Sequence, residues 1–350
     1  MTSMSSTDTT SRTAVSAYPQ LLPLNQVDHF YLGGKRISAL RGGAVTSAER
    51  RPEEWIGSMT AMTSAPERGR SRLADGTLLS DAVTTDPESW LGAEHVKAYG
   101  PSTEVLVKLL DAGQRLPVHL HPDRAFARRH LGLPHGKTEA WIVLDADAGA
   151  GVRLGFADTM RLADVRALVD RQDGAALVES LRPLEVRPGD GVLVPAGVPH
   201  AIDAGVFILE LQEPTDLSIL LEWTGFAIDG RADGHLGLGY DVALRALRLD
   251  ALDDGELAGL IRRGERPDLL PGAADPYFRA ERVRAGSRVE PGFVIALATG
   301  GTGELRTGSG DTLALRRGDA AVIPHAAGAW WLDGGVEVIA CRPPRPGAAP

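Results

Sequence analysis

The segment RPGDGVLVPAGVPH, residues 187–200, decides how this chain folds. A Gly-Asp turn at 189–190 precedes the apolar run GVLVPA at 191–196, and the length and flanking breakers of that run are typical of a β-strand. The next residues, GVPH at 197–200, place a histidine directly after a second turn. We therefore expect a strand that ends in a tight turn, with His200 just beyond it.

Short apolar runs broken by Gly, Pro and Asp continue on both sides of this segment and are also typical of strands. They are VLVKLLD at 105–111, LPVHLH at 116–121, EAWIVLD at 139–145, VFILELQ at 206–212, FVIALATG at 293–300, LALRRGDAAVIP at 313–324 and GVEVIACRP at 335–343. Two other stretches, 161–181 and 240–264, space their apolar residues by three and four, which indicates amphipathic helices. The sequence predicts a mainly β protein with helical insertions.

The pattern of residues 187–200 is partly repeated near the C-terminus. RRGDAAVIPHAAGAW at 316–330 shares an arginine, a Gly-Asp turn, an apolar run and a proline with 187–200. This partial repeat favours two β-barrels of one type, of which only the first keeps metal-site residues. The alternative is that Gly-Asp turns precede strands in many β proteins. The predicted division is a flexible Ser- and Thr-rich tail at 1–18, a metal-binding barrel at 19–155 and 183–225, a helical insertion at 156–182, a helical segment at 226–270 and a second barrel at 271–345.

The overall composition excludes several classes of protein. The 350 residues are 43% hydrophobic, enough for a buried core, and no apolar run approaches the roughly 20 residues that cross a bilayer. The net charge of −9 argues against binding to nucleic acid or to an anionic membrane. The single cysteine, Cys341, excludes an intramolecular disulfide and a Cys-based zinc site. The N-terminus has no basic-then-apolar leader, which predicts a cytoplasmic protein.

Four residues have the types and spacing of a metal site. His119 and His121 lie two apart in a run expected to be a strand, so both imidazoles project from one face. Glu139 begins another expected strand, and His200 follows the turn described above. Three nitrogens and one carboxylate can hold one divalent ion, such as zinc, manganese, iron, cobalt or nickel. Taken singly, each residue is as well explained by a hydrogen bond or by solvation, but their combination favours a metal site.

These motifs resemble a known family. Gly189, Pro195, Ala196, Gly197 and His200 fit the second half of the cupin signature, and HLH at 119–121 supplies the histidines of the first half. More closely, three segments resemble the hallmarks of the type I mannose-6-phosphate isomerases: PVHLHPDRAFA at 117–127, LPHGKTEAWIVL at 133–144 and VPAGVPHAI at 194–202.

The resemblance implies a fold, a reaction and a set of site residues. It implies two cupin barrels (jelly rolls), with zinc in the first, and the interconversion of mannose 6-phosphate and fructose 6-phosphate. Its metal ligands would be His119, His121, Glu139 and His200, and Lys137 would be an active-site lysine. The family usually has Gln at the position of His119, so the preferred metal stays open.

A second departure from the family concerns an active-site arginine. The resemblance predicts this arginine four residues after Asp216, but the chain has Leu220 there. Arg231, in the loop at 228–234, is the candidate replacement, and the alternative is an arginine that is only solvated.

The residues also suggest roles for other polar side chains. Lys137 lies two residues from Glu139, so both are expected to face one cavity, where a lysine could move a proton between two sugar carbons. Lys108 interrupts an apolar strand, and it either reaches the pocket or pairs with a carboxylate. Asp123 is expected to cap a helix, and Glu222 is a candidate pocket acid.

Three classes of function stay open at this point. The first is a metal-dependent isomerase of a sugar phosphate. The second is an isomerase or epimerase of an unphosphorylated sugar, which the missing arginine favours. The third is a sugar-binding regulatory cupin without catalytic activity. A metal-dependent dioxygenase would also use three histidines and a glutamate, but it leaves the GKTE motif at 136–139 unexplained.

Overall fold

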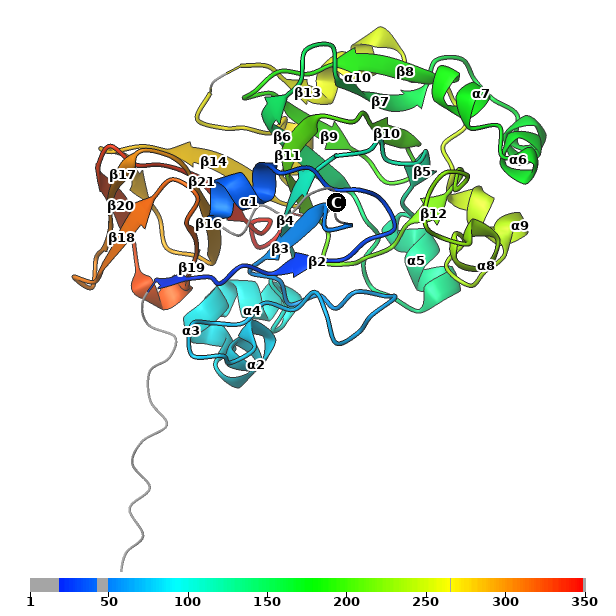
Figure 1. Cartoon of the computed structure of the whole chain (residues 1–350). Helices are drawn as coiled ribbons and strands as arrows, with labels where there is room; N and C mark the ends of the chain where they lie inside the picture. The colour runs from blue at the N-terminus through cyan, green and yellow to red at the C-terminus, as the bar shows by residue number, and fades with distance from the viewer. Residues whose placement is uncertain (1–18, 43–49, 265, 349–350) are drawn as a thin grey trace, which may run out of the picture.

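Four antiparallel sheets form the body of the protein in the computed structural model, which describes residues 19–42, 50–264 and 266–348. Two sheets make up an N-terminal unit and two a C-terminal unit (Figure 1). The predicted fold class, mainly β with helical insertions, is confirmed. The flexible tail predicted at 1–18 lies outside the described residues.

The N-terminal unit pairs a seven-stranded sheet with a five-stranded sheet. The larger sheet has the order β13 (Ile261–Arg262), β9 (Gly191–Val194), β6 (Glu139–Ala146), β11 (Val206–Gln212), β4 (Leu106–Asp111), β3 (Glu53–Ile56) and β2 (Gln26–Val27). The smaller has the order β12 (Ile219–Leu220), β5 (His119–Leu120), β10 (His200–Ile202), β7 (Gly151–Phe156) and β8 (Leu181–Glu185). The strand expected from 187–200 is β9, and β10 begins at its histidine.

The C-terminal unit repeats this arrangement with five and four strands. Its larger sheet has the order β1 (Gln20–Leu21), β19 (Ala320–Ile323), β16 (Val294–Gly300), β21 (Glu337–Arg342) and β14 (Arg279–Val283). The other has the order β15 (Arg288–Val289), β20 (Trp330–Gly334), β17 (Thr302–Thr307) and β18 (Thr312–Arg316). β1, within the range predicted for the first barrel, pairs with β19 of this unit, and β13, within the range predicted as a helical segment, pairs with β9 of the N-terminal unit. The domain boundaries expected from the sequence stay a prediction.

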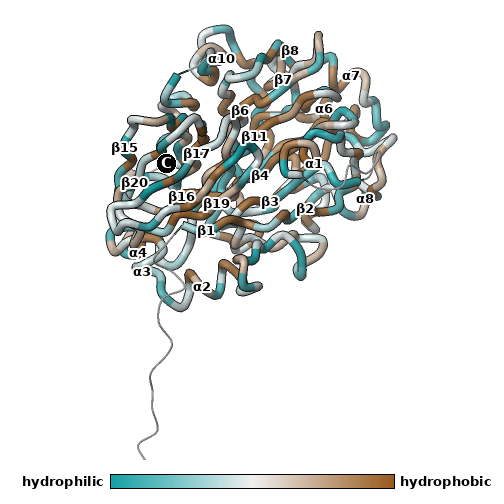
Figure 2. The backbone as a smooth tube through the Cα atoms, turned by 60° about the vertical axis from the view of Figure 1, so that its left-hand side comes forward, coloured by the Kyte–Doolittle hydropathy of each residue, from teal (hydrophilic) through white to brown (hydrophobic). Residues whose placement is uncertain are grey.

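Three apolar clusters explain why most of the strand sequences are apolar on both faces. One cluster fills the space between the two sheets of the N-terminal unit, and a second fills the C-terminal unit. A third joins the outer face of the seven-stranded sheet, through residues such as Leu209, to Ile295 and Val322 of the other unit. Strands between two cores, such as β11, are buried along their whole length. In Figure 2 the backbone along β16 and β19 carries the colour of hydrophobic residues.

Helices surround the sheets and close the ends of the N-terminal unit (Figure 1). The described helices are α1 (Arg36–Arg41), α2 (Leu79–Thr85), α3 (Pro87–Leu91), α4 (Ala93–Tyr99), α5 (Arg124–Leu131), α6 (Leu162–Arg171), α7 (Gly174–Glu179), α8 (Gly230–Asp233), α9 (Tyr240–Ala243) and α10 (Asp254–Gly259), with 3₁₀ turns η1 (Leu244–Ala246), η2 (Gly272–Ala274) and η3 (His325–Ala327). None of the helices in the described ranges has the length and hydropathy needed to cross a membrane.

The two stretches with helical periodicity form shorter helices than their patterns indicate. The 161–181 stretch is α6 and α7, separated where Gln172 takes up a left-handed conformation (φ 55°) and Asp173 caps α7. The 240–264 stretch holds α9, η1 and α10, and it ends in β13. In both stretches the apolar residues pack against the sheets of the N-terminal unit, which accounts for their spacing.

Candidate metal centre

Three histidines from neighbouring strands meet inside the N-terminal unit. His119 begins β5 and His200 begins β10, and the two are register partners in this antiparallel pair. His121 follows β5, and its ring centroid lies 5.0 Å from that of His119 and 4.9 Å from that of His200. All three are buried, and one ring nitrogen from each lies within 4.8 Å of the other two. The structure thus brings the three predicted histidines together.

The backbone fixes the orientation of these rings. Each Nδ1 lies 2.6 to 2.9 Å from a backbone carbonyl oxygen, and the three carbonyls belong to Pro117, Leu217 and Val198. An Nδ1–H that donates to a carbonyl leaves Nε2 with a lone pair, the form that binds a metal ion. Burial, reinforced by neighbouring imidazoles, holds the pKa of His119 well below its usual range. Burial and the charge of Lys137 lower the pKa of His121 to about 3, so both rings are neutral at neutral pH.

Glu139, the first residue of β6, faces two of the histidines. Its Oε2 lies 3.0 Å from Nε2 of His121, and its Oε1 lies 3.3 Å from Nε2 of His200. Both of these Nε2 atoms are buried and lack a hydrogen-bond partner among the described residues. Lone pairs that face a carboxylate are unfavourable unless a cation lies among them. Tetrahedral ligands around zinc are separated by about 3.3 Å, which matches both Glu139 distances, and the three imidazole ligand atoms lie within 4.8 Å of one another, so the residues fit a divalent metal ion.

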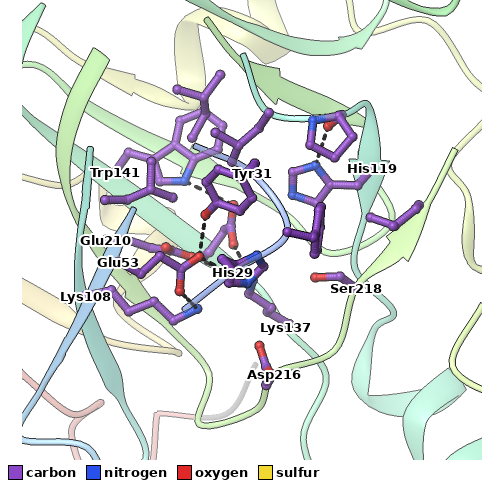
Figure 3. Close-up of a pocket in the computed structure, with 17 residues that line it drawn as sticks. His29, Tyr31, Glu53, Lys108, His119, Lys137, Trp141, Glu210, Asp216 and Ser218 are labelled. Carbon is purple, nitrogen blue, oxygen red and sulfur yellow. Dashed lines mark hydrogen bonds and ion pairs between the residues drawn. The ribbon is translucent and has the colours of Figure 1, made fainter. Parts of the chain in front are cut away.

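Lys137 stands beside this group, as its spacing from Glu139 indicates. Its side chain is buried, and Nζ lies 3.2 Å from Oε2 of Glu139 and 3.7 Å from Oε1 of Glu210. Residues from both sheets and from the β2–β3 segment line the pocket into which it projects (Figure 3). The Nζ of Lys137 therefore lies where a ligand in the pocket would meet the proposed metal ligands.

Lys108 satisfies both expectations for it, since it lines the same pocket and pairs with a carboxylate. Its Nζ lies 3.2 Å from Oε2 of Glu53 and 4.6 Å from the centroid of the Trp55 ring. Glu53 also accepts hydrogen bonds from the Tyr31 hydroxyl (2.5 Å) and from Nε1 of Trp55 (2.8 Å). Burial alone would raise the pKa of Glu53. The charge of Lys108 and the hydrogen bonds donated by Tyr31 and Trp55 instead hold the pKa of Glu53 well below the usual range.

Sequence reasoning missed Glu53 and Glu210. Glu210 is the register partner of Lys108 on the neighbouring strands β11 and β4. Burial, together with the charge of Glu139, raises the pKa of Glu210 to about 8. A signal for Glu210 was present, because it interrupts the apolar run at 206–212 just as Lys108 interrupts 105–111. No comparable signal marks Glu53, whose role depends on strand register.

Comparisons with known proteins give a consistent result. No protein-family model matches the chain. The mannose-6-phosphate isomerase of Streptococcus mutans is 29% identical over 299 residues, which are 83% of this chain and 89% of that protein. A probable mannose-6-phosphate isomerase of Bacillus subtilis is 32% identical over 188 residues, 53% of this chain and 55% of that protein.

The chain is a homologue of the mannose-6-phosphate isomerases.

Solved structures share its fold. The mannose 6-phosphate isomerase of Bacillus subtilis has a TM-score of 0.70 at 20% identity, over 93% of this chain and 99% of that one. A putative mannosephosphate isomerase from Archaeoglobus fulgidus has a TM-score of 0.72 at 18% identity, over 94% of this chain and 98% of that one. The resemblance to the mannose-6-phosphate isomerases that the motifs indicated is therefore confirmed.

Within this mannose-6-phosphate isomerase homologue, Leu220 and Arg231 lie in different places. Leu220 is buried and lines the pocket beside His119. Arg231 lies on α8, where it is exposed and its Nη2 lies 3.4 Å from the carbonyl oxygen of Asp170. It is not among the residues that line the pocket. The structure therefore does not bring the candidate replacement arginine to the site.

Two further polar residues have structural roles. The carboxylate of Asp123 accepts a hydrogen bond from the backbone N–H of Phe126 and caps α5, as expected. Glu222 is not a pocket residue. It is held by Arg115 at 2.7 Å and accepts a hydrogen bond from the backbone N–H of Val118, so it ties β12 to the segment before β5.

Proposed function

We propose that this protein is a divalent-metal-dependent aldose–ketose isomerase that interconverts mannose 6-phosphate and fructose 6-phosphate. One observation carries the proposal: Nζ of Lys137 lies 3.2 Å from a buried carboxylate that faces two histidine Nε2 atoms without a donor between them. The homologues named mannose-6-phosphate isomerase support this choice of substrate. A cytoplasmic location goes with it and stays a prediction.

In this proposal the metal ligands are His119, His121, Glu139 and His200. The Nδ1 contacts to backbone carbonyls fix the three rings, so the site is formed before any ligand enters. A bound divalent ion, for which we propose zinc, would act as a Lewis acid toward sugar oxygens. Measuring metal content tests this assignment: the wild type should hold one ion per chain, and His121→Ala should lose most of it. His130→Ala, a histidine outside the site, is the matched control.

The isomerisation moves one proton between C1 and C2 of the sugar and needs a group that can take and return it. We assign this role to Lys137. The carboxyl groups of Glu139 and Glu210 lie 3.2 Å and 3.7 Å from its Nζ, so this nitrogen has a fixed position in the pocket. The network of Lys108, Glu53 and Tyr31 lines the same pocket and presents hydroxyl and carboxylate groups that can orient sugar hydroxyls.

A second candidate is an isomerase or epimerase of an unphosphorylated sugar. The charges in the pocket favour it, because the two lysines among its lining residues are both paired with carboxylates. Leu220 supplies no charge where the resemblance predicts an arginine.

One assay separates the two candidates. Formation of fructose 6-phosphate from mannose 6-phosphate is followed in a coupled assay, in parallel with formation of fructose from mannose. The leading proposal expects a higher kcat/KM for mannose 6-phosphate. A higher kcat/KM for free mannose would replace it with the second candidate, and no turnover of mannose 6-phosphate would contradict the leading proposal.

A further inference from the structure

A second cavity lies on the C-terminal unit, where α4 meets the start of β14 and the end of β21. It shares no lining residue with the catalytic pocket. Its charged and imidazole-bearing lining residues are Arg279, Arg342, His325 from η3, and Glu94 and His95 from α4, so the two arginines outnumber the one carboxylate, that of the exposed Glu94.

The two arginines stand directly opposite each other. Arg279 begins β14 and Arg342 ends β21, and they are register partners in that antiparallel pairing. Side chains of register partners share a face and lie about 5 Å apart at Cβ, and like charges in such positions are destabilising. Two guanidinium groups are thus held together on one wall of a cavity.

Protein groups satisfy these arginines only in part. Arg342 is 7% exposed, and its Nη2 donates to the carbonyls of Glu290 and Pro291. Its Nε is buried and has no hydrogen-bond partner among the described residues. Arg279 donates from Nε to the carbonyl of Pro343, and its Nη1 lies 3.6 Å from Glu281. No salt bridge to Arg342 is found among the described residues, although the charges of Glu281 and Glu290 act on it from farther away.

The electrostatics point in the same direction. Burial first, and then the charge of Arg342, lower the pKa of Arg279 to about 10. Burial also lowers the pKa of Arg342. Both directions mean that the positive charge is disfavoured in the protein as it stands, which a bound anion would reverse.

Two glycines make room for the basic groups. A Cβ at Gly292, whose φ is 151°, would lie 2.5 Å from Nη2 of Arg342. A Cβ at Gly92, whose φ is 89°, would lie 2.5 Å from Cδ2 of His325. A side chain at either position would therefore displace Arg342 or His325 from its present place, and the positive φ at both positions favours glycine.

We propose that this cavity binds a small oxyanion, either a phosphate monoester or a carboxylate. Guanidinium groups match the planar oxygen pairs of both anions through two parallel hydrogen bonds. Phe293 and Pro343 supply an apolar wall, which suits an anion that carries an organic body. The site is additional to the proposed isomerase site, and its test measures binding rather than turnover.

Isothermal titration calorimetry on the full chain tests the proposal, with inorganic phosphate and acetate as probes at constant ionic strength set with NaCl. The wild type should show saturable binding of at least one probe, and the tighter one identifies the anion class. Arg279→Gln should weaken this binding by at least about tenfold, since it removes a charged fork. Arg279→Lys keeps the charge and should weaken it several-fold.

Two control variants complete the design. Arg306→Gln removes an exposed arginine of β17 in the same unit and should leave the affinity unchanged. Lys137→Gln alters the catalytic pocket and should also leave this binding unchanged. Absence of saturable binding in the wild type would overturn the proposal. Unchanged affinity in a folded Arg279→Gln, or in Arg279→Lys if the former does not fold, would also overturn it, and so would a loss seen only in Lys137→Gln.

Discussion

Leu220 is the register partner of His119, across the antiparallel pairing of β12 with β5. Register partners project from the same face of a sheet, and both residues line the catalytic pocket. The position at which the family resemblance predicts a cation is therefore inside the pocket, next to a proposed metal ligand, and here it is apolar.

Leu220→Arg should raise kcat/KM for mannose 6-phosphate by about tenfold or more. Charge-assisted hydrogen bonds to a phosphate contribute about 1.5–3 kcal/mol each, and the wild-type pocket lacks this guanidinium. The kcat/KM for free mannose should not rise, and Leu220→Met serves as an apolar control. A folded Leu220→Arg protein with no gain on the phosphorylated sugar would contradict this explanation.

Arg231→Ala should leave turnover of mannose 6-phosphate within about threefold of the wild type, a change worth less than roughly 1 kcal/mol of barrier. The physical reason is its position, exposed on α8 and directed toward the carbonyl of Asp170. Steady-state kinetics of the purified variant measure this. A loss of tenfold or more would assign Arg231 the role of the missing arginine after all.

Lys137→Arg should lower kcat by about 10²-fold, the lower end of the range for loss of a general acid–base group. The substitution keeps the positive charge beside Glu139, but a guanidinium does not give up its proton in a protein. Lys97→Arg, on the exposed part of α4, is the matched control and should keep full activity. If Lys137→Arg retains turnover within threefold, the role in proton transfer is wrong.

Glu104 should make the stability of the fold depend on acid pH. Burial alone would raise its pKa, but hydrogen bonds from His135, at 3.0 Å, and from Ser102 hold it below the usual 4.5. A carboxyl whose pKa is depressed on folding stabilises the protein above its unfolded pKa, and this stabilisation is lost as the pH falls through the folded pKa. Glu104→Gln should therefore be less stable than the wild type by about 1 kcal/mol at pH 7.

That difference should shrink as the pH falls below 4.5, because the unfolded carboxyl takes up a proton first, and it should vanish below the lowered pKa of the folded state. Denaturant unfolding of both proteins at pH 7 and at about pH 4 measures it. A free-energy difference that stays constant or grows with acidity would show that the Glu104 charge does not contribute in this way.

The sequence reveals what depends on local spacing. The three histidines could be found because a two-residue spacing on β5 and a turn before β10 fix where each side chain points. The sequence contains no comparable signal for strand register. The ion pair of Lys108 with Glu53, and the position of Lys108 as the register partner of Glu210, are therefore seen only once the order of strands in the sheet is known. The position of Arg231 was equally hidden, because its direction depends on how α8 packs near Asp170. The spacing of apolar residues at 240–264 indicates which residues are buried, but it does not indicate where one helix ends and the next begins.

The coupled assay of fructose 6-phosphate formation, run on metal-depleted and zinc-reloaded protein, tests the central claim most directly. Chelation should abolish turnover of mannose 6-phosphate in the wild type, and one equivalent of zinc or another divalent ion should restore it. His121→Ala should stay inactive after the same reloading, whereas His130→Ala should recover. Turnover that persists in the fully metal-depleted wild type, or that returns in His121→Ala, would contradict a metal-dependent isomerase built on this site.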